Sequence, residues 1–216
     1  MLGAPTLGLA LSITTVTAYL PKVANEFVSS NVVIGVLVGG EGLIAMALPL
    51  VVGSWSDTLQ TRIGGRLPFV LAGVPVMALA LVALGFVSSV GTMAAAVFVF
   101  FVAYFTAYEP YRALYPDLVP EEIEGKAQST QAVWRGIGTG CALALGGVLL
   151  AAGQPVPFAA AALALLVAVG IFTVVSLKRR DRTRRRRPEA EGVRARAREL
   201  VALIREHPPL RTSGSA

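Results

Sequence analysis

Six long apolar segments recur along the first 177 residues, and most polar positions fall between them. Bilayer hydrocarbon about 30 Å thick requires roughly 20 apolar residues in a helix that rises 1.5 Å per residue. The segments lack the alternation of apolar and polar positions that is typical of barrel strands, so helices are predicted. We expect spans at about residues 3–20, 32–52, 67–87, 92–115, 128–152 and 155–177.

The pattern therefore predicts an all-α membrane protein, with residues 1–177 forming one six-span bundle and residues 178–216 forming a basic tail. The first apolar segment lacks the basic start and cleavage site of a signal peptide, which makes it the first span. Within the tail, residues 189–206 place apolar side chains at helical spacing, so a short amphipathic helix is predicted there.

Charge is distributed unevenly along the chain, whose net charge is +6. Residues 1–177 carry six Lys or Arg and eight Asp or Glu, whereas residues 178–187 carry eight Lys or Arg and one Asp. The basic run is confined to the tail, so the body offers no nucleic-acid-binding surface. One Cys and one His exclude a disulfide framework and a His/Cys metal site. Nucleotide-binding and nucleophile motifs are absent from the sequence, so no cofactor and no enzymatic activity are expected.

The connections between spans predict the orientation in the membrane, because Lys and Arg accumulate on the cytoplasmic side. Arg62 and Arg66 follow the second span, Lys126 follows the fourth, and the basic run follows the sixth. The intervening connections carry a single Lys or Arg, which is Lys22. We therefore expect both termini to be cytoplasmic, in a plasma or bacterial inner membrane.

Ionisable residues inside predicted spans are candidate functional groups, because charge is costly in lipid. Glu41, near the midpoint of its span, is a candidate for coupling or substrate binding; the alternative is a protonated carboxyl that is hydrogen-bonded within the bundle. Its neighbours Gly39, Gly40 and Gly42 are expected to let another helix approach closely. Glu109 and Arg112 stand three residues apart, and they either pair or contact a substrate.

The fifth predicted span offers a further candidate, Arg135. Because it stands near the start of this span, it either extends to the interface or has a functional role. The same span carries glycines that predict a small face packed against another span. These are Gly136, Gly138, Gly140, Gly146 and Gly147.

Residues 53–69, after the second span, carry a spaced motif of small, acidic and basic residues. The motif resembles the loop 2–3 signature of the major facilitator superfamily, in particular that of the sucrose-transporter and glycoside–cation symporter branch. The matching residues are Gly53, Ser56, Asp57, Arg62, Gly64, Arg66, Pro68 and Phe69. The resemblance implies a cytoplasmic latch between two halves of a transporter; the alternative is a charged loop that only fixes topology.

A second segment, beginning Pro110-Tyr111-Arg112-Ala113-Leu114, is similar to the P-x-R-A-L-x-x-D-L segment of the same branch. The resemblance implies that Arg112 binds substrate. The branch places a coupling carboxylate eleven residues earlier, where this chain has Phe101.

The resemblance covers one six-span half of the superfamily fold and implies alternating access, which requires a second half on a separate chain or from a second copy. It implies uptake of a sugar or glycoside coupled to a cation, H⁺ or Na⁺. Two alternatives stay open, namely efflux or other small-solute transport on the same fold, and a non-transporting half that serves membrane interaction or assembly.

Overall fold

The computed structural model describes residues 3–59, 66–118, 122 and 124–186, and the described chain is built of six α-helices. The prediction of an all-α chain with six apolar helices is confirmed, and each helix is long and apolar enough to cross a membrane. The helices are α1 (Ala4–Ala24), α2 (Asn31–Thr58), α3 (Leu67–Leu84), α4 (Val90–Leu118), α5 (Glu124–Ala152) and α6 (Pro155–Arg186).

The chain divides into two compact units, residues 1–174 and 175–216. The first unit holds α1 to α5 and most of α6, and it is the helical bundle described below. In the second unit the backbone stays helical as far as Arg186. The amphipathic helix predicted at 189–206 lies outside the described residues.

Several helices are longer than the apolar segments that predict them. α2 continues to Thr58, α4 continues to Leu118, and α5 begins at Glu124. An apolar pattern identifies only the apolar part of a helix. The helical hydrogen bonds of the backbone continue into the polar residues at either end, so the helix is longer than the apolar segment. The motif after the second span therefore begins inside α2.

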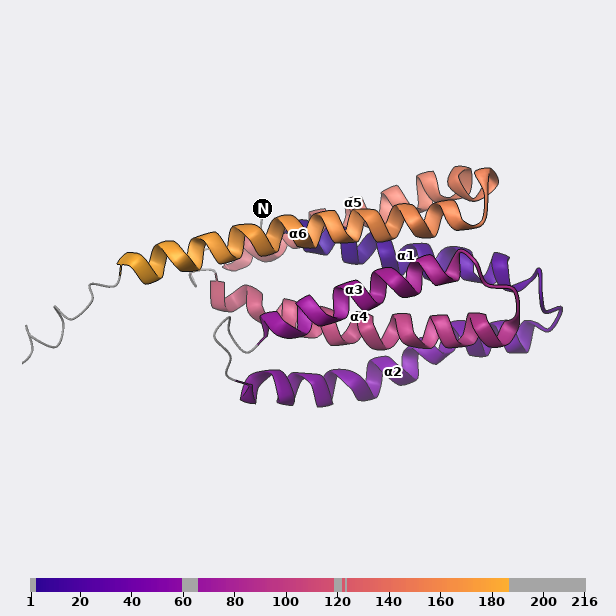
Figure 1. Ribbon diagram of the computed structural model, residues 1–216, viewed down its shortest axis with the longest axis horizontal. Helices are drawn as coiled ribbons and strands as arrows, with labels where there is room; N and C mark the ends of the chain where they lie inside the picture. The colour runs from indigo at the N-terminus through magenta and orange to yellow at the C-terminus, as the bar shows by residue number, and fades with distance from the viewer. Residues whose placement is uncertain (1–2, 60–65, 119–121, 123, 187–216) are drawn as a thin grey trace, which may run out of the picture. The chain divides into compact units, whose positions relative to one another are not determined.

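Helix pairs in the bundle pack closely where one partner has no side chain. α3 lies along α4, α1 along α5, and α2 along the other side of α4 (Figure 1). Gly73 of α3 lies against the backbone of α4 at Ala103 and Ala107, and Gly138 of α5 lies against α1 at Leu7. Small residues allow such approach in membranes, where association depends on packing rather than on the hydrophobic effect.

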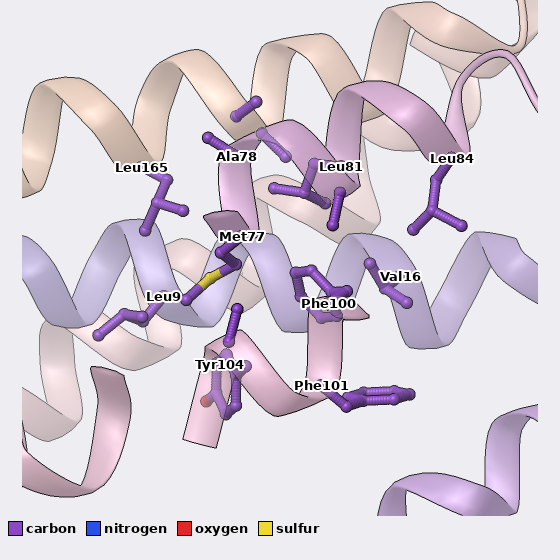
Figure 2. Packing of buried hydrophobic residues seen from close by; sticks show 14 of the residues in the cluster. Leu9, Val16, Met77, Ala78, Leu81, Leu84, Phe100, Phe101, Tyr104 and Leu165 are labelled. Atoms are coloured by element: carbon purple, nitrogen blue, oxygen red, sulfur yellow. The ribbon is translucent and has the colours of Figure 1, made fainter. Parts of the chain in front are cut away.

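Large apolar side chains from α1, α3, α4 and α6 fill the interior of the bundle. Figure 2 shows part of this core, including Leu9 of α1, Met77 of α3, Phe100 of α4 and Leu165 of α6, all at most 1% exposed. Because these four helices share one core, α4 is held in a fixed rotation about its axis. This rotation decides which of its polar residues face away from the core.

α2 and α5 are the least covered helices. Only 6% of the α2 span and 17% of the α5 span is buried, compared with 39% or more in the other four. At nine of their glycines, a Cβ added to the residue would meet no described atom within 4 Å, apart from the neighbouring backbone of the same helix. These are Gly35, Gly39, Gly40, Gly42 and Gly53 of α2, and Gly125, Gly136, Gly140 and Gly147 of α5.

Two expectations about close packing are corrected by this finding. A Cβ added at Gly39, Gly40 or Gly42, beside Glu41, would meet no other helix of the described chain within 4 Å. On α5, only Gly138 and Gly146 pack against another helix, in both cases α1. The remaining glycines of α5 lie on a different side of the helix, because residues one or two positions apart point in different directions.

Candidate functional site

Tyr104 lies near the middle of α4, and its ring belongs to the hydrophobic core (Figure 2). The ring is stacked on Tyr108, with centroids 5.1 Å apart, and it meets Phe105 edge-on at 5.2 Å. The side chain is 7% exposed. Aromatic pairs in these geometries are favourable, so the position of the Tyr104 hydroxyl is fixed by the packing of its ring.

Charged residues on three helices lie within electrostatic range of Tyr104. They are Glu41 of α2, Glu109 of α4 and Arg135 of α5. We call Glu41, Tyr104, Tyr108, Glu109, Arg112 and Arg135 the central polar cluster.

Arg112 joins the cluster through two neighbours on its own helix. Its Nη1 lies 3.8 Å from Oε1 of Glu109, and its guanidinium carbon lies 5.6 Å from the centroid of the Tyr108 ring. The expected pairing of Glu109 with Arg112 is thus present. Both contacts orient the guanidinium, although 55% of the Arg112 side chain remains exposed.

The two remaining charges have no such partner. Neither Glu41 nor Arg135 forms a salt bridge with any residue that the structure describes. Glu41 is half-buried and Arg135 is exposed. The cluster is balanced overall, with two carboxylates and two guanidinium groups. It therefore offers hydrogen-bond donors and acceptors of both charges to a polar solute.

Among the described residues, no group of three or more His, Cys, Asp or Glu could hold a metal ion.

Residues 6–214 of the chain match the family model of the Major Facilitator Superfamily. The chain belongs to the major facilitator superfamily. Together with the six apolar helices, this membership makes it a multi-pass membrane transporter. No match was found among curated proteins.

The superfamily motif after the second span lies at the end of α2 and the start of α3. Buried Ser56 donates a hydrogen bond to the carbonyl of Gly53, 2.9 Å away, and Pro68 stands in the first turn of α3. Arg66 donates through Nη1 to the carbonyl of Ala113 in α4 at 2.6 Å. The side chain of Asp57 and all of Arg62 and Gly64 lie outside the described residues.

Arg135 is an exposed residue of α5. The helix begins at Glu124, so Arg135 stands about 16 Å along it at 1.5 Å per residue. It lies within electrostatic range of Tyr104 on α4.

Two features of this site were not assigned from the sequence. The first is the hydroxyl of Tyr104, which had no distinguishing mark within a run of aromatic residues. The second is Gln131, whose side-chain nitrogen is buried without a hydrogen-bond partner in the described part of the chain. The spacing of Gln131, Arg135 and Thr139 at four-residue intervals was the available signal, because such residues share one face of a helix.

Proposed function

We propose that this chain is one half of a secondary transporter that carries a sugar or glycoside together with a cation, H⁺ or Na⁺, by alternating access. The observation that carries the proposal is the central polar cluster, in which Tyr104, Tyr108, Glu109 and Arg112 are linked by contacts along α4, and Glu41 of α2 and Arg135 of α5 lie within electrostatic range of Tyr104. Hydroxyl-rich solutes bind through many hydrogen bonds, and the cluster supplies guanidinium donors, carboxylate acceptors and two phenols.

The exposure of the charges supports a solute pathway at this place. Arg112 and Arg135 are exposed on helices that cross the membrane, where contact with lipid would cost several kcal/mol for each charge, about 2.5–3.5 by insertion scales. Such residues instead face a bundle interior or a water-filled cavity. The described helices leave one side of the cluster open, so a cavity there requires further protein.

A second six-helix half, from another chain or from a second copy, would supply that protein. The open glycines of α2 and α5 support this, since Gly35 and Gly39 on α2, and Gly136 and Gly140 on α5, are spaced four residues apart on exposed faces. This spacing permits close helix packing in membranes. The charged cluster would then lie between two halves, extending from Tyr104 in the middle of α4 to Arg112 at the end of its apolar span.

Within this transporter we assign roles by chemistry. Glu41 is the group that binds the coupling cation, because it is the acid of the cluster that has no guanidinium partner in the described structure. Arg112 and Arg135 bind the solute, with Glu109 orienting Arg112. The Asp57–Arg66 segment acts as a cytoplasmic latch, and both termini are cytoplasmic.

Uptake into proteoliposomes tests the proposal. The purified chain is reconstituted, and entry of a labelled disaccharide is followed with an inward H⁺ gradient, an inward Na⁺ gradient or neither. We expect one gradient to drive accumulation and Glu41→Gln to abolish the gradient-driven part. Glu26→Gln is the matched control, because Glu26 is an exposed carboxylate in the connection between α1 and α2.

Each other outcome contradicts a specific part of the proposal. Gradient-driven exit instead of entry would indicate efflux. Unchanged accumulation in Glu41→Gln would remove Glu41 from coupling. Absence of flux for every solute, with the chain alone and with covalently linked copies, would favour a non-transporting membrane interaction protein.

A further inference from the structure

A groove of about 310 Å³ runs between α2 and α4 at the ends nearest the α1–α2 and α3–α4 connections. This volume is at the lower end of the range for small-molecule sites, roughly 300–1,000 Å³. The groove is almost entirely apolar. It is lined by Val36, Leu37, Gly40, Leu43 and Ile44 of α2, and by Ala94, Val97, Phe98 and Phe101 of α4.

The groove is continuous with the central polar cluster along one face of α4. Phe98, Phe101, Tyr108 and Arg112 follow one another at spacings of three, seven and four residues, which places them on the same side of the helix. Tyr108 lies about 10 Å beyond Phe101 at 1.5 Å per residue. The apolar wall of the groove thus passes directly into the polar residues.

On α2, Leu37 and Ile44 line the groove, and Glu41 stands between them, one turn from each, within electrostatic range of Tyr104. Glu41 therefore stands within the stretch of α2 that lines the groove, whereas on α4 the polar residues come beyond the end of the groove. A solute that bound the cluster alone would leave this apolar space unfilled.

We propose that the groove is the apolar subsite of the transporter, so that the solute is amphipathic, with a polar group in the central polar cluster and an aromatic or alkyl group between α2 and α4. The sugar character of the polar group rests on the proposed function. The presence of an apolar group rests on the groove alone. Phe98 and Phe101 provide ring surfaces for an apolar group, and the distance from Phe101 to Tyr108 sets the length of the solute.

Gly40 provides a direct way to test the subsite. It lines the groove, and a Cβ at this position would meet no atom of the described chain within 4 Å. Gly40→Leu therefore adds a side chain to the wall of the groove, and its Cβ displaces no protein atom. Gly170→Leu is the matched control, because Gly170 on α6 is also open, is exposed, and is not part of the groove.

The experiment measures equilibrium binding of methyl β-glucoside and phenyl β-glucoside to the chain in lipid nanodiscs, with empty nanodiscs subtracted. We expect the phenyl compound to bind at least about tenfold more tightly, which equals about 1.4 kcal/mol. Gly40→Leu should reduce this ratio to about one, and Gly170→Leu should leave it unchanged.

Equal affinities in the unmodified chain would overturn the inference, as would a ratio that Gly40→Leu does not change. A second result would also overturn it, namely a glucoside ratio near one together with a lipid that co-purifies with the unmodified chain and with Gly170→Leu, but not with Gly40→Leu. The groove would then hold an acyl chain. A second bundle covering the groove would likewise give a ratio near one.

Failure of the sugar proposal is distinguishable from failure of the groove inference. If neither glucoside binds, the same comparison is made with methylammonium and benzylammonium. A preference for benzylammonium that Gly40→Leu abolishes would retain the apolar subsite and reject the sugar. No preference in either pair would reject the subsite.

Discussion

The hydroxyls of Thr6 and Tyr111 lie 2.9 Å apart in the buried interior and join the first turn of α1 to the last part of α4. Tyr111 also meets the ring of Phe172 edge-on at 5.7 Å. Successive residues of a helix point about 100° apart, so burying Tyr111 turns the neighbouring Arg112 outward. This hydrogen bond, together with the packing of the Tyr111 ring in the core, fixes the rotation of the part of α4 that carries the proposed substrate residue.

We predict that removing this hydrogen bond destabilises the bundle. Tyr111→Phe should lower the free energy of unfolding by about 0.5–1.5 kcal/mol, a typical range for an intramolecular hydrogen bond. Reversible unfolding in mixed detergent measures the change. The double variant with Thr6→Val isolates the pair, because the second substitution should cost much less once the first is present. Strictly additive costs would show that the two hydroxyls do not interact.

The hydroxyl of Tyr104 should matter for solute binding and not for folding. Its ring is held by aromatic neighbours, and no hydrogen bond joins the hydroxyl to the described residues. Tyr104→Phe should weaken solute binding by about fivefold to tenfold, corresponding to roughly 1–1.4 kcal/mol for one hydrogen bond.

Tyr19 is the control for this prediction, because its hydroxyl is hydrogen-bonded within the bundle. The Tyr19 hydroxyl donates to the carbonyls of Ala142 and Leu143 at 3.0 and 3.1 Å. Tyr19→Phe should lower thermal stability and leave solute affinity unchanged. An equal loss of affinity in both variants would remove Tyr104 from the site.

Two adjacent glycines of α5 should respond differently to the same substitution. A Cβ at Gly146 would overlap the ring of Tyr19, whereas a Cβ at Gly147 would meet nothing within 4 Å. Gly146→Ala should destabilise the bundle by about 1–3 kcal/mol, because the hydrogen-bonded Tyr19 ring must move. Gly147→Ala should be neutral or slightly stabilising. Equal thermal midpoints for the two variants would contradict the packing of α5 on α1.

The open faces of α2 and α5 predict how a second half docks. Gly39→Leu and Gly140→Leu should each weaken association between chains in lipid by at least about tenfold, since a larger side chain prevents close approach. Fluorescence energy transfer between labelled chains in liposomes measures this, with Gly170→Leu as the control. Association that persists unchanged in both variants would place the interface on other helices.

Arg66 distinguishes a latch from a loop that only fixes topology. Its guanidinium donates to the carbonyl of Ala113, and lysine keeps the charge but lacks the planar donor group. We expect Arg66→Lys to slow uptake by at least about tenfold while solute affinity is unchanged, since one charge-assisted hydrogen bond is worth about 1.5–3 kcal/mol. Uptake equal to that of the unmodified chain would indicate that only the positive charge at this position is required.

Hydropathy alone determined the class of the protein, because each span must be an uninterrupted apolar helix wherever its neighbours lie. It also singled out Glu41 and Arg112, since a charge within an apolar segment stands out without any knowledge of contacts. Tertiary packing decided what these residues do together. Whether Tyr104 lies near both Glu41 and Arg135 depends on the rotation of three helices, and each rotation depends on contacts between residues far apart in the sequence. These include Thr6 with Tyr111, Gly73 with α4 and Gly138 with α1. The groove beside Phe101 arises in the same way, from the space between two helices.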